Sequence, residues 1–217
     1  MADAMTYGFE VIVSNSKRND TQNITGVFGT VAGTTFTPAA VNAGFLCKKA
    51  GLDAPANRTF NEGYALHEIR NKNDFYMVAA NNGLEAKFPG DHTGIYAANT
   101  YNVNTLTDGS LVINFPGKTL GLQTPAGERT DYTEIIIGEM YAFGYLNTSY
   151  AATQDSAEAD ENFAPGTVLS IANGVLSSAA GTAGHLAFEV IDGTGRFTEG
   201  AADGGRKIIV QAIRVAE

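Results

Sequence analysis

Short apolar or alternating runs, separated by turn residues, recur along most of this chain. Runs of this kind are typical of β-strands, and their spacing indicates an all-β or β-rich domain. The runs that predict strands most clearly cover residues 9–13, 75–80, 84–88, 111–115, 167–171, 175–178, 185–191 and 207–215. Asn-Gly pairs at 82–83 and 173–174 predict tight hairpin turns, because these residues accept the positive φ angles that such turns require. Residues 107–110, TDGS, predict a further turn.

The longest apolar run covers residues 133–145 and begins with β-branched residues. It is interrupted by Gly138 and Gly144. Because a glycine inside a strand often marks a bulge or a bend, we expect one central strand that bends at one of these glycines.

Helical content is expected to be low, and residues 37–51 have two interpretations. As a helix, the segment would have Thr37 as its amino-terminal cap, Pro38 in the first turn and Gly51 at its end. As a strand, residues 45–49 would match a weak internal echo between AGFLCKKAGL and PGTVLSIANGVL. The two interpretations are nearly balanced, and we favour the strand.

Residues 151–162 differ in composition from the rest of the chain, because they are small, polar and acidic, with four carboxylates and no basic residue. Such a segment predicts a loop or linker. We therefore divide the chain into an amino-terminal arm or first strand (1–14), a β-rich lobe (15–150), an acidic loop (151–162) and a β-barrel segment (163–217). The predicted fold class is mainly β, a small barrel-like or sandwich-like fold with little helix, and two β-rich lobes are one form of it.

Charge and cysteine content narrow the function classes. The chain has 217 residues, a formal net charge of −9 and one cysteine. A nucleic-acid partner is not expected, because the longest basic run, Lys17-Arg18, is too short to follow a phosphate backbone. A membrane span or a signal peptide is not expected either, because no apolar run reaches about 18 residues and the first residues lack a basic segment. A single cysteine cannot form a disulfide within the chain.

Candidate chemistry is sparse. The histidines His67, His92 and His185 lack the spacing of a zinc site, which needs three or four converging ligands. Cys47 lies in an apolar run, where a buried thiol is the usual role. The GKT at 117–119 is not a P-loop, because Val112 stands where that motif needs glycine. We expect no catalytic, cofactor or metal residues, and the pair Asp91-His92 is the strongest exception.

The carboxyl-terminal part resembles a known family. Residues 163–191, FAPGTVLSIANGVLSSAAGTAGHLAFEVI, and the final run KIIVQAIRV are similar to the barrel segment of bacteriophage head decoration (capsid cement) proteins of the lambda type. The resemblance covers residues 163–215, whereas about 150 residues precede it and the family's chains are usually shorter. It implies a virion protein without cofactor, made in the host cytoplasm, that binds the major capsid protein on the capsid surface, commonly as a trimer.

Within that interpretation, the first apolar run is the candidate capsid contact. Phe9, Val11 and Val13 alternate, as they would in a strand added to a strand of the capsid protein. The alternative is an ordinary first strand of the chain's own sheet. Other functions that stay open are a phage tail or head-fibre component, a carbohydrate-binding β-sandwich with Tyr and Phe at its binding face, and an enzyme that uses Asp91 or His92.

Overall fold

The computed structural model describes ten segments of the chain. They are residues 8–13, 24–53, 75–81, 92–99, 104–105, 111–112, 123–149, 163–178, 182–193 and 207–215. Nearly all regular structure in them is β-strand, apart from the short 3-10 helix η4 (Tyr145–Asn147). The predicted mainly β class is confirmed. No helix in these segments is long and apolar enough to cross a membrane.

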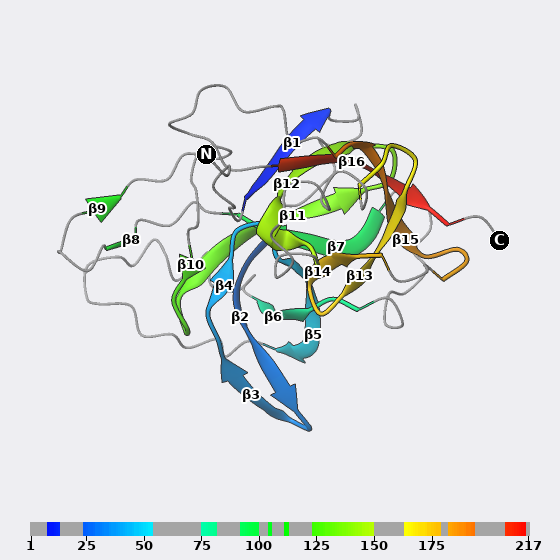
Figure 1. Ribbon diagram of the computed structural model, residues 1–217. Coiled ribbons are helices and arrows are strands. Elements are labelled where there is room, and N and C mark those ends of the chain that lie inside the picture. Colours follow the sequence, from blue (N-terminus) through cyan, green and yellow to red (C-terminus); the bar gives the residue numbers. More distant parts are fainter. Residues whose placement is uncertain are drawn as a thin grey trace.

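A closed ring of five strands forms one half of the structure (Figure 1). Around the ring the strands are β11 (Arg129–Ile136), β7 (His92–Ala98), β5 (Leu46–Asp53), β6 (Phe75–Ala79) and β2 (Ile24–Ala32). The pairing of β2 with β11 closes the ring. Among these five strands, β2 and β6 form the one parallel pair. The second half of β2 leaves the ring and pairs with β3 (Thr35–Pro38) as a projecting hairpin.

An open antiparallel sheet of six strands forms the other half. Its order is β1 (Phe9–Val13), β12 (Met140–Gly144), β16 (Lys207–Arg214), β15 (Leu186–Asp192), β13 (Val168–Ala172) and β14 (Val175–Ser177). Two small ladders complete the described strands, β4 (Val41–Asn42) with β10 (Gln123–Thr124) and β8 (Asn104–Thr105) with β9 (Leu111–Val112).

Two hydrophobic cores follow from this arrangement. Strand β7 shows the division, because Ile95 and Ala97 belong to one core and Tyr96 and Ala98 to the other. Successive side chains of a strand point to opposite faces, so β5, β7 and β11 supply both cores, whereas β2 and β6 supply the barrel core. The barrel core lies inside the ring and contains Ile24, Phe28, Val41, Cys47, Met77, Tyr96, Ala98 and Tyr132. The larger core lies between the ring and the open sheet. It joins residues of β5, β7 and β11 to residues of β1 and of the strands β12 to β16.

The hairpin predicted at residues 173–174 is confirmed. Strands β13 and β14 pair across it, and Asn173 and Gly174 have φ angles of 48° and 80°. The helical interpretation of residues 37–51 is wrong, because the segment contains β4 and most of β5. In β5, Leu46 enters the larger core and Cys47 the barrel core, so the strand buries both of its faces.

The single bent strand expected at residues 133–145 is also wrong. Those residues belong to β11 and β12, which lie in different sheets. Gly138, with a φ angle of 90°, lies in the turn between them. The glycine interrupts the apolar run because the chain passes there from the barrel to the open sheet.

The two sheets are not divided at residues 151–162. The closed ring lies wholly between residues 24 and 136, whereas residues 163–215 contribute β13 to β16 to an open sheet that they share with β1 and β12. This differs from the barrel segment expected at 163–217. Strand β12 pairs with β16, and both strands supply residues to the larger core. Residues before 151 and residues after 162 therefore complete this sheet only together.

Several expectations concern residues outside the described segments. They are the turn at 82–83 with its return strand 84–88, the turn at 107–110, residues 113–115, the acidic loop, Lys17-Arg18, His67 and Asp91.

Candidate functional site

Five side chains gather at one end of the barrel, which we call the barrel mouth: Lys49, Phe75, His92, Tyr96 and Glu134. Strands β6 and β7 begin at this end, and β5 and β11 finish there. Tyr96 is paired with Cys47 on one side and with Glu134 on the other. Directly paired residues share a face, so Glu134 lies on the same inner side of the ring as Tyr96 and Cys47.

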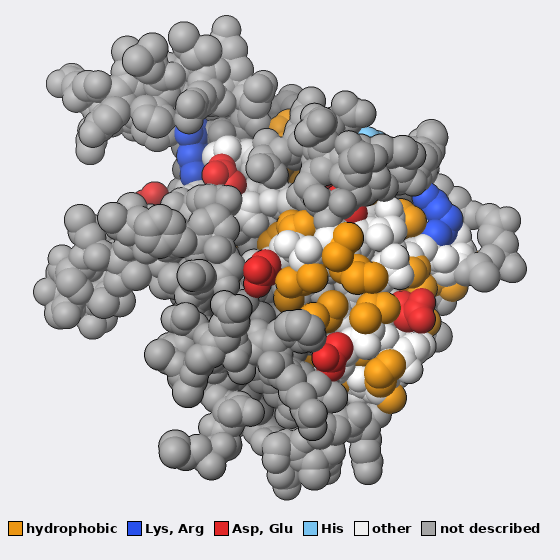
Figure 2. All heavy atoms as spheres, turned by 90° about the horizontal axis from the view of Figure 1, so that it is seen from above, with side chains coloured by type: hydrophobic (Ala, Val, Ile, Leu, Met, Phe, Trp, Pro, Cys, Tyr) orange, Lys and Arg blue, Asp and Glu red, His pale blue; other side chains and the backbone are white. Residues whose placement is uncertain are grey.

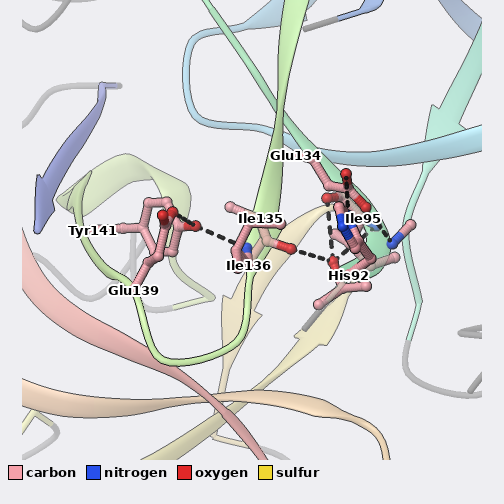
Figure 3. A network of polar contacts seen from close by, with 9 residues as sticks. His92, Ile95, Glu134, Ile135, Ile136, Glu139 and Tyr141 are labelled. Atoms are coloured by element: carbon pink, nitrogen blue, oxygen red, sulfur yellow. Dashed lines mark hydrogen bonds and ion pairs between the residues drawn. The ribbon is translucent and has the colours of Figure 1, made fainter. Parts of the chain in front are cut away.

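His92 and Glu134 form the centre of the site (Figure 3). The His92 Nδ1 lies 3.1 Å from Glu134 Oε2, and the Gly94 N–H donates to Glu134 Oε1 over 3.2 Å. The His92 side chain is 45% exposed and that of Glu134 only 9%, so the buried carboxylate holds an imidazole at the surface. A bulge between Glu134 and Ile136 sets this geometry by bringing Ile136 opposite His92.

Because Glu134 accepts from Nδ1, the second ring nitrogen of His92, Nε2, is the one that can meet a ligand. A carboxylate that orients an imidazole in this way is the arrangement found beside catalytic histidines. A nucleophile would have to lie within hydrogen-bond reach of that ring. Among the described residues, the only hydrogen-bond contact of the His92 ring is the one to Glu134.

A polar network connects the site to the open sheet (Figure 3). Thr93 donates its hydroxyl to the Ile135 carbonyl over 2.6 Å, and the next peptide N–H, of Ile136, donates to the Tyr141 hydroxyl over 2.8 Å. The Tyr141 hydroxyl in turn donates to Glu139 Oε2 over 2.7 Å. Since one peptide unit carries contacts to both sheets, the network fixes the end of β11, where Glu134 lies.

Lys49 lies over two aromatic rings of the mouth. Its ammonium nitrogen is 4.0 Å from the centroid of Phe75 and 5.8 Å from that of Tyr96. Cation–π contacts of this kind are worth about 0.5–1 kcal/mol at exposed sites. Within the part of the chain that the structure describes, no carboxylate forms a salt bridge with this ammonium. Lys49 is therefore a positioned cation without a protein counter-ion there.

Burial affects the protonation of Tyr96 and of Cys47, which is paired with it across β7 and β5. Burial, together with the negative charge of Glu134, raises the pKa of Tyr96 to about 12. The Tyr96 phenol is therefore protonated at neutral pH and can act as a hydrogen-bond donor. Burial alone raises the pKa of the Cys47 thiol well above its ordinary value. A neutral, fully buried thiol is a poor nucleophile, which agrees with the packing role expected for Cys47.

The structure places the predicted capsid-contact residues in the edge strand β1. Phe9 is buried and stacks on Tyr141, with ring centroids 5.5 Å apart. Val11 is partly buried against the larger core, and Val13 is 49% exposed. Strand β1 pairs with β12, so it is the first strand of the chain's own sheet, and no other described strand pairs with its far edge. A role of these residues in capsid contact stays a prediction.

The remaining sequence candidates do not converge. His185 lies just before β15 in the open sheet, away from the barrel mouth. Within the described segments, no group of three or more His, Cys, Asp or Glu residues is placed to hold a metal ion. Sequence reasoning singled out His92 but missed Lys49, Tyr96 and Glu134. Glu134 lies in a run interpreted as a strand, Lys49 in a segment interpreted as a helix or a strand, and Tyr96 in no predicted element, and no motif connects them.

Comparisons with protein-family models, with curated proteins and with solved structures found no match to this chain.

Proposed function

We propose that this chain is a non-enzymatic bacteriophage structural protein that binds and stabilises the exterior of the capsid as a head decoration protein. Its partner is the major capsid protein, and its place is the capsid surface after synthesis in the host cytoplasm. The resemblance of residues 163–215 to that family motivates the proposal. The structural observation that carries it is the open edge of β1.

The main chain of β1 is suited to strand addition. Gly8 accepts a hydrogen bond from the Gly144 N–H over 2.9 Å, so Gly8 and Glu10 direct their main-chain groups toward β12. In an antiparallel ladder the alternate residues direct theirs to the other side. Phe9 and Val11 therefore present N–H and C=O groups at the open edge, where an extended capsid segment can pair with them.

Exposed apolar side chains accompany this edge. Ile12 is 41% and Val13 49% exposed, and Val168 and Ile191 are further exposed residues on strands of the same sheet. Figure 2 shows a face of the molecule on which hydrophobic side chains gather, with acidic side chains among them. Of these exposed residues, Ile12 and Val13 lie on β1 itself, and exposed apolar side chains beside an open edge are common at protein interaction sites. In this proposal the main chain of Phe9 and Val11 supplies affinity, and the side chain of Val13 supplies fit.

A trimer extends the proposal. Three copies around a local three-fold axis would present three identical β1 edges. Each contact then raises the effective concentration of the next, so individually weak edges produce tight attachment.

The test is co-sedimentation of the purified protein with expanded heads that lack it. We expect saturable binding at a fixed ratio to capsid subunits, and loss of binding in Val13→Asp. Deletion of residues 1–13 is a poorer test, because it also removes Phe9 from the larger core. The matched control is Val31→Asp, a similarly exposed valine on the β2–β3 hairpin, which should bind normally.

Absence of binding to both expanded and unexpanded heads would contradict the proposal. The tail or head-fibre component and the glycan-binding module would then be the functions to test. Equal loss of binding in the Val13 and Val31 variants would contradict the assignment of the contact to β1.

A further inference from the structure

We propose that the barrel mouth binds a small ligand through a single carboxylate group, such as that of a sugar acid. This inference does not depend on the capsid role, since the mouth lies at the end of the ring and β1 lies in the open sheet.

Two hydrogen-bond donors of the mouth, the Lys49 ammonium and the Tyr96 hydroxyl, lack acceptors among the described residues. The Lys49 ammonium contacts only aromatic rings, and the Tyr96 hydroxyl has no hydrogen-bond partner there. The His92 ring donates its Nδ1–H to the Glu134 carboxylate, so Nε2 of the neutral ring is an acceptor that a hydroxyl of the ligand can meet. The Lys49 ammonium lies 5.8 Å from the centroid of the Tyr96 ring, so one anionic group can reach both the ammonium and the Tyr96 hydroxyl.

The charges of the site select the kind of acceptor. Lys49 attracts an anion, and the protonated Tyr96 hydroxyl can donate to it. Glu134 lies beside both His92 and Tyr96 and repels further negative charge, as does the net charge of −9. A group with one negative charge meets this balance better than a dianion such as phosphate. The carboxylate is the common organic group with that charge and two acceptor oxygens.

The site is held in place before a ligand binds. Both oxygens of Glu134 are engaged, one by His92 and one by the Gly94 N–H, so the imidazole has a fixed orientation. The rings of Phe75 and Tyr96 hold the Lys49 side chain. Fixed groups lose little conformational entropy when a ligand binds, which favours specific recognition. With so few contacts, the expected Kd for a simple sugar acid is on the order of 1 mM.

The test is an NMR titration of the full chain with galacturonate, followed through the ring protons of the histidines. We expect saturable shifts of the His92 signals and none of the His185 signals. Galactose, which lacks the carboxylate, should cause no shift, and inorganic phosphate at pH 8 should bind more weakly than galacturonate.

Two variants locate the site. Lys49→Met keeps an apolar side chain over Phe75 but removes the charge, and should weaken galacturonate binding at least tenfold. Lys48→Met is the matched control, because Lys48 is the preceding residue of β5 and its side chain lies on the opposite face of the strand. That variant should bind like the parent protein.

The proposal is overturned if the His92 signals do not move at a galacturonate concentration about 50-fold above the expected Kd. It is also overturned if galactose shifts them equally, if phosphate binds more tightly than galacturonate, or if the two lysine variants lose binding to the same extent.

Discussion

The two cores of this protein are both closed to solvent, but they contain different chemistry. The larger core has eighteen buried residues, all apolar except for Tyr141, whose hydroxyl both donates and accepts a hydrogen bond. The barrel core has eight, among them Cys47, Tyr96 and Tyr132, and the Tyr132 hydroxyl has no partner among the described residues. Burial raises the pKa of Tyr132, so its phenol stays neutral.

The difference has a geometric cause. Two sheets that face each other provide a wide apolar layer, and polar groups are confined to its margin. A ring of five strands has a narrow interior, and its inward side chains soon reach an open end. Polar side chains inside the ring therefore lie close to water at the mouth. We infer that the larger core mainly determines stability, whereas the barrel end provides the candidate site.

The largest effect is expected where the open sheet meets the barrel. Gly174 accepts from the Leu46 N–H and donates to the Ala80 carbonyl, and a Cβ added there would overlap the Phe45 ring. Gly174→Val should reduce the free energy of unfolding by about 3–5 kcal/mol, because strain at positive φ adds to steric overlap. Urea denaturation measures it.

Gly33→Val is the control for that variant. Gly33 also has a positive φ, 62°, but an added Cβ would meet nothing within 4 Å. The expected loss is about 1–2 kcal/mol, from backbone strain alone. Equal losses of unfolding free energy in Gly174→Val and Gly33→Val would show that the contact of the β13–β14 hairpin with the barrel contributes nothing to stability.

Asn147 should give the next largest effect. Its side chain accepts from the Gly8 N–H over 3.0 Å and donates to the Ala43 carbonyl over 2.8 Å, and it is buried. Asn147→Ala leaves both main-chain groups without partners and should cost about 2–4 kcal/mol in urea denaturation. Gln123→Ala, which removes an exposed amide contact to Asn42, should cost under about 0.5 kcal/mol. If both variants lose the same unfolding free energy, the buried contacts of Asn147 stabilise the protein no more than an exposed amide contact does.

The alkaline pH dependence tests the barrel mouth. The pKa of Tyr96 is raised from 10.0 to about 12, so ionisation is less favourable in the folded protein than in the unfolded chain. The resulting stabilisation is complete below pH 10 and is lost as the pH rises through 12. Discounted for solvent screening of the phenol, it amounts to about 1–2 kcal/mol. Tyr96→Phe should therefore flatten the decrease in unfolding free energy between pH 10 and 12, and an unchanged slope would contradict burial of this phenol beside Glu134.

The smallest effect is expected at Glu134. Glu134→Gln removes the charge but keeps a carbonyl oxygen that can accept from the Gly94 N–H. Since His92 is 45% exposed, solvent screens the pair, and the loss of unfolding free energy should be at most about 1 kcal/mol. A loss above 2 kcal/mol in urea denaturation would mean that the mouth contributes to stability as a core does.

Part of this fold followed from local sequence pattern. The strands at 9–13, 75–79 and 168–177 were predicted because alternation and the pair Asn173-Gly174 act over a few residues. Gly138 was recognised as an interruption but assigned to a bulge. Local pattern cannot separate a bend within one strand from a turn between two sheets, because both require the same glycine conformation.

The sequence by itself determined the β class, the positions of many strands and the turn at 173–174, since these depend on side-chain alternation and on the φ angles that asparagine and glycine accept. Only the tertiary structure decided which strands pair, that β2 closes a ring with β11, and that β1 and β12 join the carboxyl-terminal strands. It also decided the site, because His92 and Glu134 are 42 residues apart and meet only through the pairing of β7 with β11. Such pairings follow from burying whole faces of strands together, which no short stretch of sequence specifies.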